Sequence, residues 1–328
     1  MLTLPCPLEA GWEVVQQQVL PRTSADGRPL GGFSALLAES PQGPLWLLSD
    51  APEPFTVVLE AGGEAPRLLW QPLAPQPLQG LPRRPFDGEA LVTTMGSAGQ
   101  RWWMASEGRL NLDQPAELLQ LEKSAPGAGF RLVGRTPLPD EWQPRPGRGL
   151  RPNGGPEALL PLPGERLLIA AEAPLQQDPP DRLRLLLADT RGAVRFQALG
   201  ATLAYRPAVG AEEHWGLTEL LGLPGDRGRR LLALWRGYAP PGRWWTHLEL
   251  LPAPDPRAAA TAPLQPLAVW DLQDEGLAPD NWEAMAPGPP LPGDRGSLWM
   301  VSDDNFNPLQ ANRVALIAPR RQPGCKEP

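Results

Sequence analysis

One structural plan occurs five times along the chain, and this repeat limits the possible folds more than any other feature. Each copy has a small acidic or hydroxyl residue before an apolar strand, then a turn rich in Pro and Gly, then a second apolar strand ending in a charged residue. The copies are residues 31–50, 86–108, 153–175, 214–237 and 280–305. This pattern is typical of a β-hairpin, and its recurrence indicates a repeat architecture.

The intervals between the hairpins leave room for two further strands each. The apolar segments in these intervals are 55–61, 66–73, 117–123, 130–138, 182–190, 194–205, 244–253 and 264–272. After the fifth hairpin only residues 312–319 remain, so we expect residues 11–20 to supply the missing outer strand. We therefore predict one all-β domain over residues 1–328, a five-bladed β-propeller of four-stranded blades closed by the N-terminal strand, with short tails at 1–10 and 320–328. Six blades are the alternative, if the linkers at 174–182 or 251–262 hide another unit.

Composition agrees with this fold and excludes several classes of protein. With 45 Pro and 34 Gly in 328 residues, long helices are not expected, while 41% hydrophobic residues and 13 Trp supply enough apolar surface for a core. No apolar run reaches the ~18 residues of a membrane helix. The net charge of −7 and the lack of a basic run argue against binding to nucleic acid or anionic lipid. We expect partners that are cationic or bridged by a metal.

The repeat places polar side chains together at the open end of each hairpin, because the first residue of one strand lies beside the last residue of its antiparallel partner. The first set is Ser34, Glu89, Glu157, Glu219 and Glu283; the second is Asp50, Glu107, Glu172, Arg236 and Asp303. Since the first strand of a propeller blade lines the channel, we expect both sets at one channel mouth. A structural role, in which an acid holds backbone amides of the next blade, stays open for Glu89, Glu157 and Glu219.

So many carboxylates raise each other's pKa, and a hard cation would relieve their repulsion. Oxygen ligands select Ca²⁺, with Mg²⁺ as the second choice, and two Cys and two His are too few for a zinc site. The segment 301–307 is the densest in oxygen ligands, with Asp303, Asp304 and Asn305 in succession. We predict that these three residues and Glu219 hold the metal.

The motifs GGFSAL, LWLLSD, NGGPEAL, LLIAAE, GLTELLGLP, LLALWR, DNWEAM and LWMVSDDNF make the chain similar to the phytase-like proteins, described by an "esterase-like activity of phytase" domain, over roughly residues 28–318. The resemblance implies a propeller, usually exported, with calcium-assisted hydrolysis of phosphate or other esters. The matching positions are Ser34, Asp50, Glu157, Glu172, Glu219, Arg236, Asn281, Glu283, Asp303, Asn305 and Phe306. In RPNGGPE (151–157) Arg151 is displaced from the pattern, and only two Lys occur, so a small ester fits better than inositol hexakisphosphate.

We therefore expect a calcium-assisted phosphoesterase or esterase in which Glu157, Glu283 and Arg236 carry the chemistry. Its ligand-binding residues would be Ser34, Asp50, Glu89, Glu107, Glu172, Arg151 and Asn281. The alternative is a non-catalytic propeller that binds a ligand or a protein on the same face, with Trp102, Trp103, Trp244 and Trp245 as aromatic platforms, one of each pair being exposed. A serine hydrolase is disfavoured because the sequence has no GxSxG.

Cys6 and Cys325 flank the strands predicted to close the last blade, so they either form a bridge or remain two free thiols. A bridge would imply an oxidising compartment, hence the periplasm or the extracellular space. The segment MLTLPCPLEAGW has no signal-peptide pattern, which leaves the cytoplasm open.

Overall fold

The fold was analysed in a computed structural model, which describes the whole chain except residues 1, 51–53, 63–68, 82–85, 97–98, 125–128, 206–212, 224–225, 227, 258–261, 294 and 326–328. Almost all of the regular structure is β-strand; the helical elements are the single 3₁₀ turns η1 (Leu8–Ala10) and η2 (Leu110–Leu112). Within the described residues no helix is long and apolar enough to cross a membrane.

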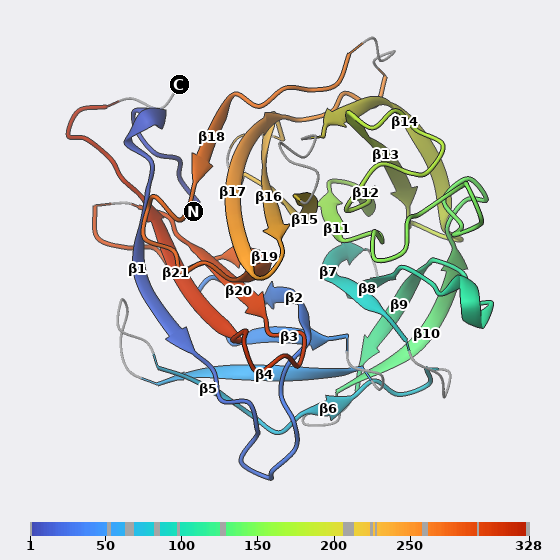
Figure 1. Ribbon diagram of the computed structural model, residues 1–328, viewed down its shortest axis with the longest axis horizontal. Coiled ribbons are helices and arrows are strands. Elements are labelled where there is room, and N and C mark those ends of the chain that lie inside the picture. Colours follow the sequence, from blue (N-terminus) through green and yellow to red (C-terminus); the bar gives the residue numbers. More distant parts are fainter. Residues whose placement is uncertain are drawn as a thin grey trace.

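Five four-stranded antiparallel sheets form a ring (Figure 1). Blade one is β2 (Phe33–Ala38), β3 (Leu45–Ser49), β4 (Phe55–Gly62) and β5 (Leu69–Pro72), with β6 (Gln76–Pro77) also paired to β4; blade two is β7 (Gly88–Gly96), β8 (Gly99–Ser106), β9 (Glu117–Lys123) and β10 (Phe130–Pro137). Blade three is β11 (Ala158–Leu162), β12 (Arg166–Ala170), β13 (Arg182–Asp189) and β14 (Arg195–Ala204); blade four is β15 (His214–Gly222), β16 (Arg230–Ala239), β17 (Arg243–Pro252) and β18 (Ala268–Asp271). Blade five is β19 (Asn281–Pro287), β20 (Leu298–Asp303), β21 (Arg313–Pro319) and β1 (Trp12–Val19).

The N-terminal strand closes the ring. β1 runs antiparallel to β21, with Trp12 opposite Pro319 and Val19 opposite Arg313. The innermost strands β2, β7, β11, β15 and β19 contact one another in order around the channel. The prediction of five blades closed by residues 11–20 is confirmed, and six blades are excluded as the arrangement of this chain. Closure packs each blade between two neighbours, so that the free edges of each sheet are its innermost strand, at the channel, and its outermost strand.

The hydrophobic core is divided into five clusters, one between each pair of adjacent blades. Both faces of the second strand of a blade are therefore covered. Trp102 and Trp103 on β8 are 3% and 2% exposed, with Trp102 against Phe130 and Trp46 and the indole N–H of Trp103 donating to Thr94 at 3.0 Å. The prediction that one member of this pair forms an exposed platform is wrong, because a neighbouring blade packs on each side.

The two chain ends meet beside blade five. Cys6 and Cys325 form a disulfide with Cα atoms 5.7 Å apart, and backbone hydrogen bonds join Cys6 to Arg320 and Gln322. The sequence left open whether Cys6 and Cys325 are bonded or free, and the structure contains the disulfide bond. A disulfide of this kind is typical of proteins exported to an oxidising compartment.

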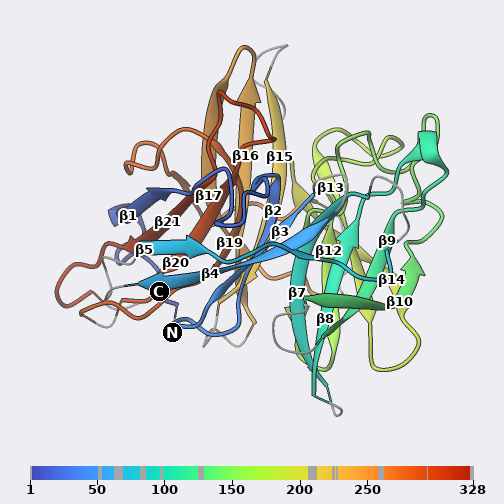
Figure 2. The same ribbon diagram turned by 90° about the horizontal axis from the view of Figure 1, so that it is seen from below.

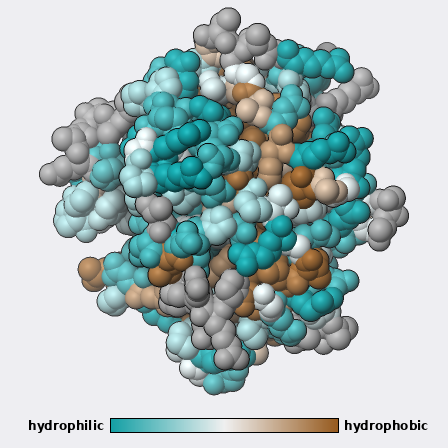
Figure 3. Space-filling view, turned by 90° about the vertical axis from the view of Figure 1, so that its right-hand side faces the viewer, coloured by the Kyte–Doolittle hydropathy of each residue, from teal (hydrophilic) through white to brown (hydrophobic). Residues whose placement is uncertain are grey.

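The outer surface beside β10 and β14 carries hydrophilic and apolar residues intermixed (Figure 3). In the side view the hairpin of β16 and β17, with β15 beside it, reaches beyond the neighbouring strands on one face of the disc (Figure 2). This face carries the site described next.

Candidate functional site

In four of the five blades a β-bulge lies near the start of the innermost strand, and one residue there is left out of the pairing with the second strand. The register of the first two strands skips one residue in blades one, two, four and five, and the skipped residues are Ser34, Glu89, Thr218 and Glu283. A bulge leaves its extra residue unpaired and re-aims its side chain. In blade three Glu157 comes directly before β11.

The hydroxyl members of this set join neighbouring blades. Ser34 donates to the carbonyl of Gly88 at 2.5 Å, and Thr218 donates to the carbonyl of Trp282 at 3.4 Å. Gly88 and Trp282 each precede the bulge of the next blade. The bulge position therefore carries an acid in blades two and five and a blade-linking hydroxyl in blades one and four.

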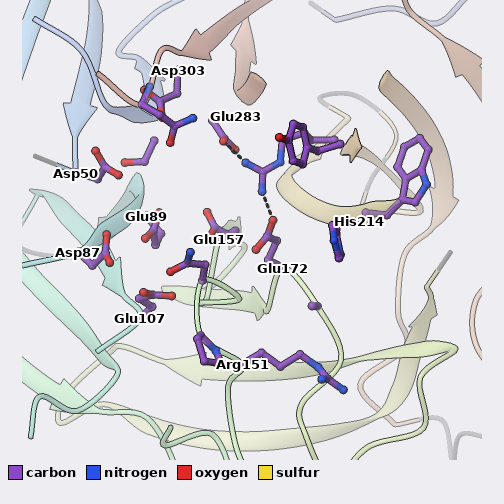
Figure 4. A pocket seen from close by; sticks show the side chains of 18 of the residues that line it. Asp50, Asp87, Glu89, Glu107, Arg151, Glu157, Glu172, His214, Glu283 and Asp303 are labelled. Atoms are coloured by element: carbon purple, nitrogen blue, oxygen red, sulfur yellow. Dashed lines mark hydrogen bonds and ion pairs between the residues drawn. The ribbon is translucent and has the colours of Figure 1, made fainter. Parts of the chain in front are cut away.

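A second ring of charged residues lies within three residues of the end of the second strand of each blade. Its members are Asp50, Glu107, Glu172, Arg236 and Asp303, as the repeat predicted. Together the two rings surround a cavity of about 780 Å³. The carboxyl groups among its described lining residues are Asp50, Asp87, Glu89, Glu107, Glu157, Glu172, Glu213, Glu283 and Asp303, and the arginines are Arg109, Arg151 and Arg236 (Figure 4).

Arg236 on β16 connects three blades. One guanidinium nitrogen donates to Glu283 and, at 2.9 Å, to the side-chain oxygen of Asn281 in blade five; the other donates to Glu172 in blade three (Figure 4). Burial opposes the charge of Arg236, but Glu283 and Glu172 outweigh it and raise the pKa of the guanidinium. Arg236 is thus held by two carboxylates, and its charge is already balanced.

The other acids carry more negative charge than the arginines compensate. Burial first, and then Asp303 and Asp87, raise the pKa of Asp50 to about 8. Burial and Asp87 raise the pKa of Glu107 to about 9. Burial raises the pKa of Asp303 to about 6, and it raises that of Glu283 to about 7 against the opposing charge of Arg236. Several of these groups hold protons at neutral pH unless another cation takes their place.

Three acids of blade two lie close enough to share one ion. A carboxylate oxygen from each of Asp87, Glu89 and Glu107 lies within 4.8 Å of the other two. Arg109 donates to Asp87 at 2.9 Å and fixes its orientation. Burial, followed by Glu157 and Asp87, raises the pKa of Glu89 well above its usual value. Three hard oxygen donors in this arrangement fit Ca²⁺.

Glu157 is, like Asp50 and Glu89, a cavity acid whose carboxylate is not held by a described residue. It is 9% exposed, lines the cavity, and receives no hydrogen bond or ion pair among the described residues. Figure 4 places it between the acids of blade two and Glu172. Burial and the charge of Glu172 raise its pKa well above the usual range. An unheld, largely buried carboxyl group beside an acidic triad is the strongest indication of chemistry in this cavity.

The proposed metal ligands on segment 301–307 have other partners. One oxygen of Asp303 accepts from the backbone N–H groups of Phe33 at 3.0 Å and Asn305 at 2.9 Å. Asp304 accepts from the backbone of Phe306 at 3.0 Å, pairs with Arg22 at 3.2 Å, and is not among the described lining residues. Asp303 and Asn305 do line the cavity. Through these contacts Asp303 and Asp304 hold the loop in position against blade one.

Two further predicted site residues lie outside the described lining. Glu219 is buried, and one of its oxygens accepts from the N–H of Leu220 at 2.9 Å. The side-chain oxygen of Asn281 accepts from Arg236, and a hydrogen bond from the same side chain lowers the pKa of Glu283. The remaining predicted residues, Ser34, Asp50, Glu89, Glu107, Arg151, Glu157, Glu172, Arg236 and Glu283, line one cavity.

Sequence reasoning missed Asp87 and the aromatic wall. Asp87 lies two residues before Glu89. The corresponding residue in blades one, three and four is a glycine, namely Gly32, Gly155 and Gly216, so an acid at this repeat position was the sequence feature that could have identified Asp87. Four aromatic residues line the cavity, Tyr205, Trp215, Tyr238 and Trp244, of which only Trp244 was predicted from the sequence; the neighbouring pair Tyr238 and Trp244 forms the aromatic wall.

The fold and the cavity define a five-bladed propeller with an acidic pocket at one mouth of its channel. The chain belongs to the Phytase-like family, "Esterase-like activity of phytase", whose sequence profile matches residues 28–306. No curated protein matches the chain.

Two solved structures that resemble the chain are distant from it in sequence. An exo-β-1,3-galactanase from Phanerochaete chrysosporium is 9% identical, with a TM-score of 0.51 over 93% of this chain, which spans 64% of that protein. An exo-1,5-α-L-arabinanase from a bovine ruminal metagenomic library is 10% identical, with a TM-score of 0.48, 90% of this chain and 94% of that one being covered. At 9% identity the likeness to the galactanase shows the fold alone.

Proposed function

We propose that this protein is a divalent-cation-dependent hydrolase of small esters, with its active site in the acidic cavity. The observation that carries the proposal is the juxtaposition of the unheld carboxyl group of Glu157 with the acids Asp87, Glu89 and Glu107. Membership of a family named for esterase-like activity supports the same reaction class.

Asp87, Glu89 and Glu107 would hold the cation, for which Ca²⁺ is the best fit. The test of fit is their chemistry: three carboxylate oxygens lie within 4.8 Å of one another, and burial, followed by the neighbouring carboxyl charges, raises the pKa of Glu89 and of Glu107. Bound Ca²⁺ would polarise an ester oxygen and favour ionisation of a water molecule.

Glu157 would act as general base. A water molecule gives its proton to Glu157 while its oxygen bonds to the acyl carbon or phosphorus of the ester, and the bond to the alcohol oxygen then breaks. The departing alcohol oxygen takes a proton from Glu283, whose pKa of about 7 permits it to donate near neutral pH. Arg236 holds Glu283 and Glu172 in place through its hydrogen bonds, and while Glu283 is protonated Glu172 balances the guanidinium charge.

The substrate would carry little negative charge. Arg236 is balanced by two carboxylates and Arg109 pairs with Asp87, so only a small share of the cationic charge is open to an anion. A polyphosphorylated ligand would meet nine carboxyl groups. We further propose that the protein works in the periplasm or outside the cell, supported by the Cys6–Cys325 disulfide.

The test is hydrolysis of p-nitrophenyl acetate and p-nitrophenyl phosphate by purified protein with Ca²⁺, Mg²⁺ or EDTA. We expect turnover that needs Ca²⁺, and a loss of at least tenfold in kcat in Glu157→Gln. Glu122→Gln, an exposed acid on the outer part of blade two, is the matched control and should behave as wild type. Equal turnover in EDTA, or full activity of Glu157→Gln, would refute the proposal; no turnover of any ester would leave ligand binding at this face as the function.

A further inference from the structure

We propose that the cavity binds an organic ammonium group against the aromatic wall of blade four. Combined with the proposed function, on which this extension rests, the substrates would be esters of amino alcohols. The binding site itself is argued from the wall, from the charge around it and from the unheld carboxyl group of Glu157.

The wall is built by cross-strand neighbours on the tall hairpin of blade four. His214 on β15 is opposite Tyr238 on β16, and Tyr238 is opposite Trp244 on β17. The rings of Tyr238 and Trp244 are 4.5 Å apart at 41°. Both side chains are half-buried and line the cavity, so part of each ring faces the space in which a ligand would lie.

This wall stands directly above the ion pairs of Arg236. Side chains two residues apart on a strand share one face, and the spacing is about 7 Å, so Tyr238 lies one step beyond Arg236 toward the mouth. Arg236 in turn binds Glu172 and Glu283. A group resting on Tyr238 and Trp244 would therefore have carboxylates below it.

A second aromatic row supports the hairpin from its other face. Trp215 and Trp245 flank Gly237 in register, and Trp215 packs against His247 at 4.6 Å between ring centres. A Cβ atom on Gly237 would lie 2.9 Å from the indole ring of Trp215. Glycine at this position of β16 therefore allows the indole to pack over the strand. The hydroxyl of Tyr205 donates to the carbonyl of Trp215. These contacts hold the hairpin in position.

The charge of the cavity selects a cation. Among the described lining residues nine carboxyl groups face three arginines. The field reaches the aromatic side, because burial and the charge of Glu172 raise the pKa of Tyr205 to about 12. Glu157 is 91% buried, since its exposed fraction is 9%, it lines the cavity, and its carboxyl group has no hydrogen-bond partner among the described residues, so this group is open to a ligand.

An alkylammonium group satisfies both features. A metal ion prefers oxygen ligands and gains nothing from rings, whereas an organic cation is attracted to the faces of Trp and Tyr as well as to carboxylates. A neutral ligand of the same shape would gain binding energy from contact with the rings but none from the carboxylates. The acids Asp87, Glu89 and Glu107 belong to blade two and the wall belongs to blade four, so an inorganic cation and the ammonium group would occupy different parts of the cavity.

Titration of metal-free protein with choline, and with its neutral isostere 3,3-dimethylbutan-1-ol, tests the site at pH 8 by calorimetry. We expect choline to bind at least about tenfold more tightly than the isostere. Trp244→Leu and Tyr238→Leu should each weaken choline binding about tenfold, whereas Trp245→Leu, the next residue on the opposite strand face, should not. Thermal unfolding of each variant checks that it is folded.

Equal affinity for the two probes, no binding of choline, or binding of D-glucose as tight as that of choline would overturn the inference. A parallel assay of acetylthiocholine hydrolysis in Ca²⁺ separates the two proposals. Choline binding without hydrolysis of any ester would retain the ammonium site and reject the hydrolase. Hydrolysis of p-nitrophenyl acetate without choline binding would do the reverse.

Discussion

Glu219 in blade four occupies the register position that Ala284 occupies in blade five. Glu219 is opposite Leu234 and Ala284 opposite Val301, each directly after the bulge residue of its strand. The same position is alanine in the other blades: Ala35, Ala90 and Ala158. These alanines belong to the apolar clusters between blades, so Glu219 places a carboxyl group where the fold otherwise has a methyl group.

Replacing this carboxyl group should stabilise the protein increasingly as the pH rises. Burial raises the pKa of Glu219 well above its usual value. The unfolded chain ionises above a pKa of about 4.3 while the folded one stays protonated, so stability falls as the pH rises. Glu219→Gln removes this loss, and each pH unit above about 4.5 should add up to about 1.4 kcal/mol to its advantage in urea unfolding.

Glu122→Gln, on the exposed surface, is the control and should show no such trend. A constant difference between Glu219→Gln and wild type from pH 4.5 to 8 would contradict the assignment of Glu219 to the blade interface.

The misplacement of Glu219 illustrates where sequence reasoning stops. Matching glutamates across the five copies aligns Glu219 with Glu89 and Glu283, but the bulge of blade four falls on Thr218. Thr218 does what Ser34 does, donating to the carbonyl before the next bulge. A one-residue shift reverses the direction of a strand side chain, and a bulge is not visible in the apolar pattern.

Removing Arg236 should destabilise the fold through the acids that it leaves behind. Breaking one side of a largely buried ion pair typically costs about 3 kcal/mol or more, and Arg236 holds both Glu172 and Glu283. Arg236→Met should therefore lower the free energy of unfolding by roughly that amount at pH 8. The triple variant Arg236→Met/Glu172→Gln/Glu283→Gln should recover much of the loss. A single variant as stable as wild type would show that these ion pairs contribute nothing.

The disulfide should contribute strongly to stability because it joins residues 319 positions apart. The chain-entropy account gives about 5–6 kcal/mol as an upper value for such a loop. Cys6→Ser/Cys325→Ser should lower the thermal midpoint, and reduction of the wild type should have the same effect. If reduced and oxidised protein melted together, the strand pairing and side-chain contacts of β1 would be sufficient to hold it.

The sequence was sufficient for the overall fold because every copy of the repeat carries its own apolar strands and turns. It also brought most of the cavity together, since the two charged rings follow from hairpin pairing. The aromatic wall needed three-dimensional information: Tyr238 and Trp244 become neighbours only through the register of β16 and β17, and Trp102 and Trp103 are covered by blade packing.

Calcium binding by metal-free protein tests the central claim most directly, because every step proposed for this cavity depends on uncompensated acids. Calorimetry should show saturable binding of Ca²⁺ that is lost in Asp87→Asn/Glu89→Gln and kept in Glu122→Gln. Affinity should rise between pH 6 and 9, with proton release, since the pKa of Glu107 is about 9 and Ca²⁺ takes the deprotonated form. At a hundredfold excess over Kd, Ca²⁺ should stabilise the fold by about 2.7 kcal/mol. No binding heat and an unchanged melting curve at millimolar Ca²⁺, or equally tight binding by the double variant, would contradict the account.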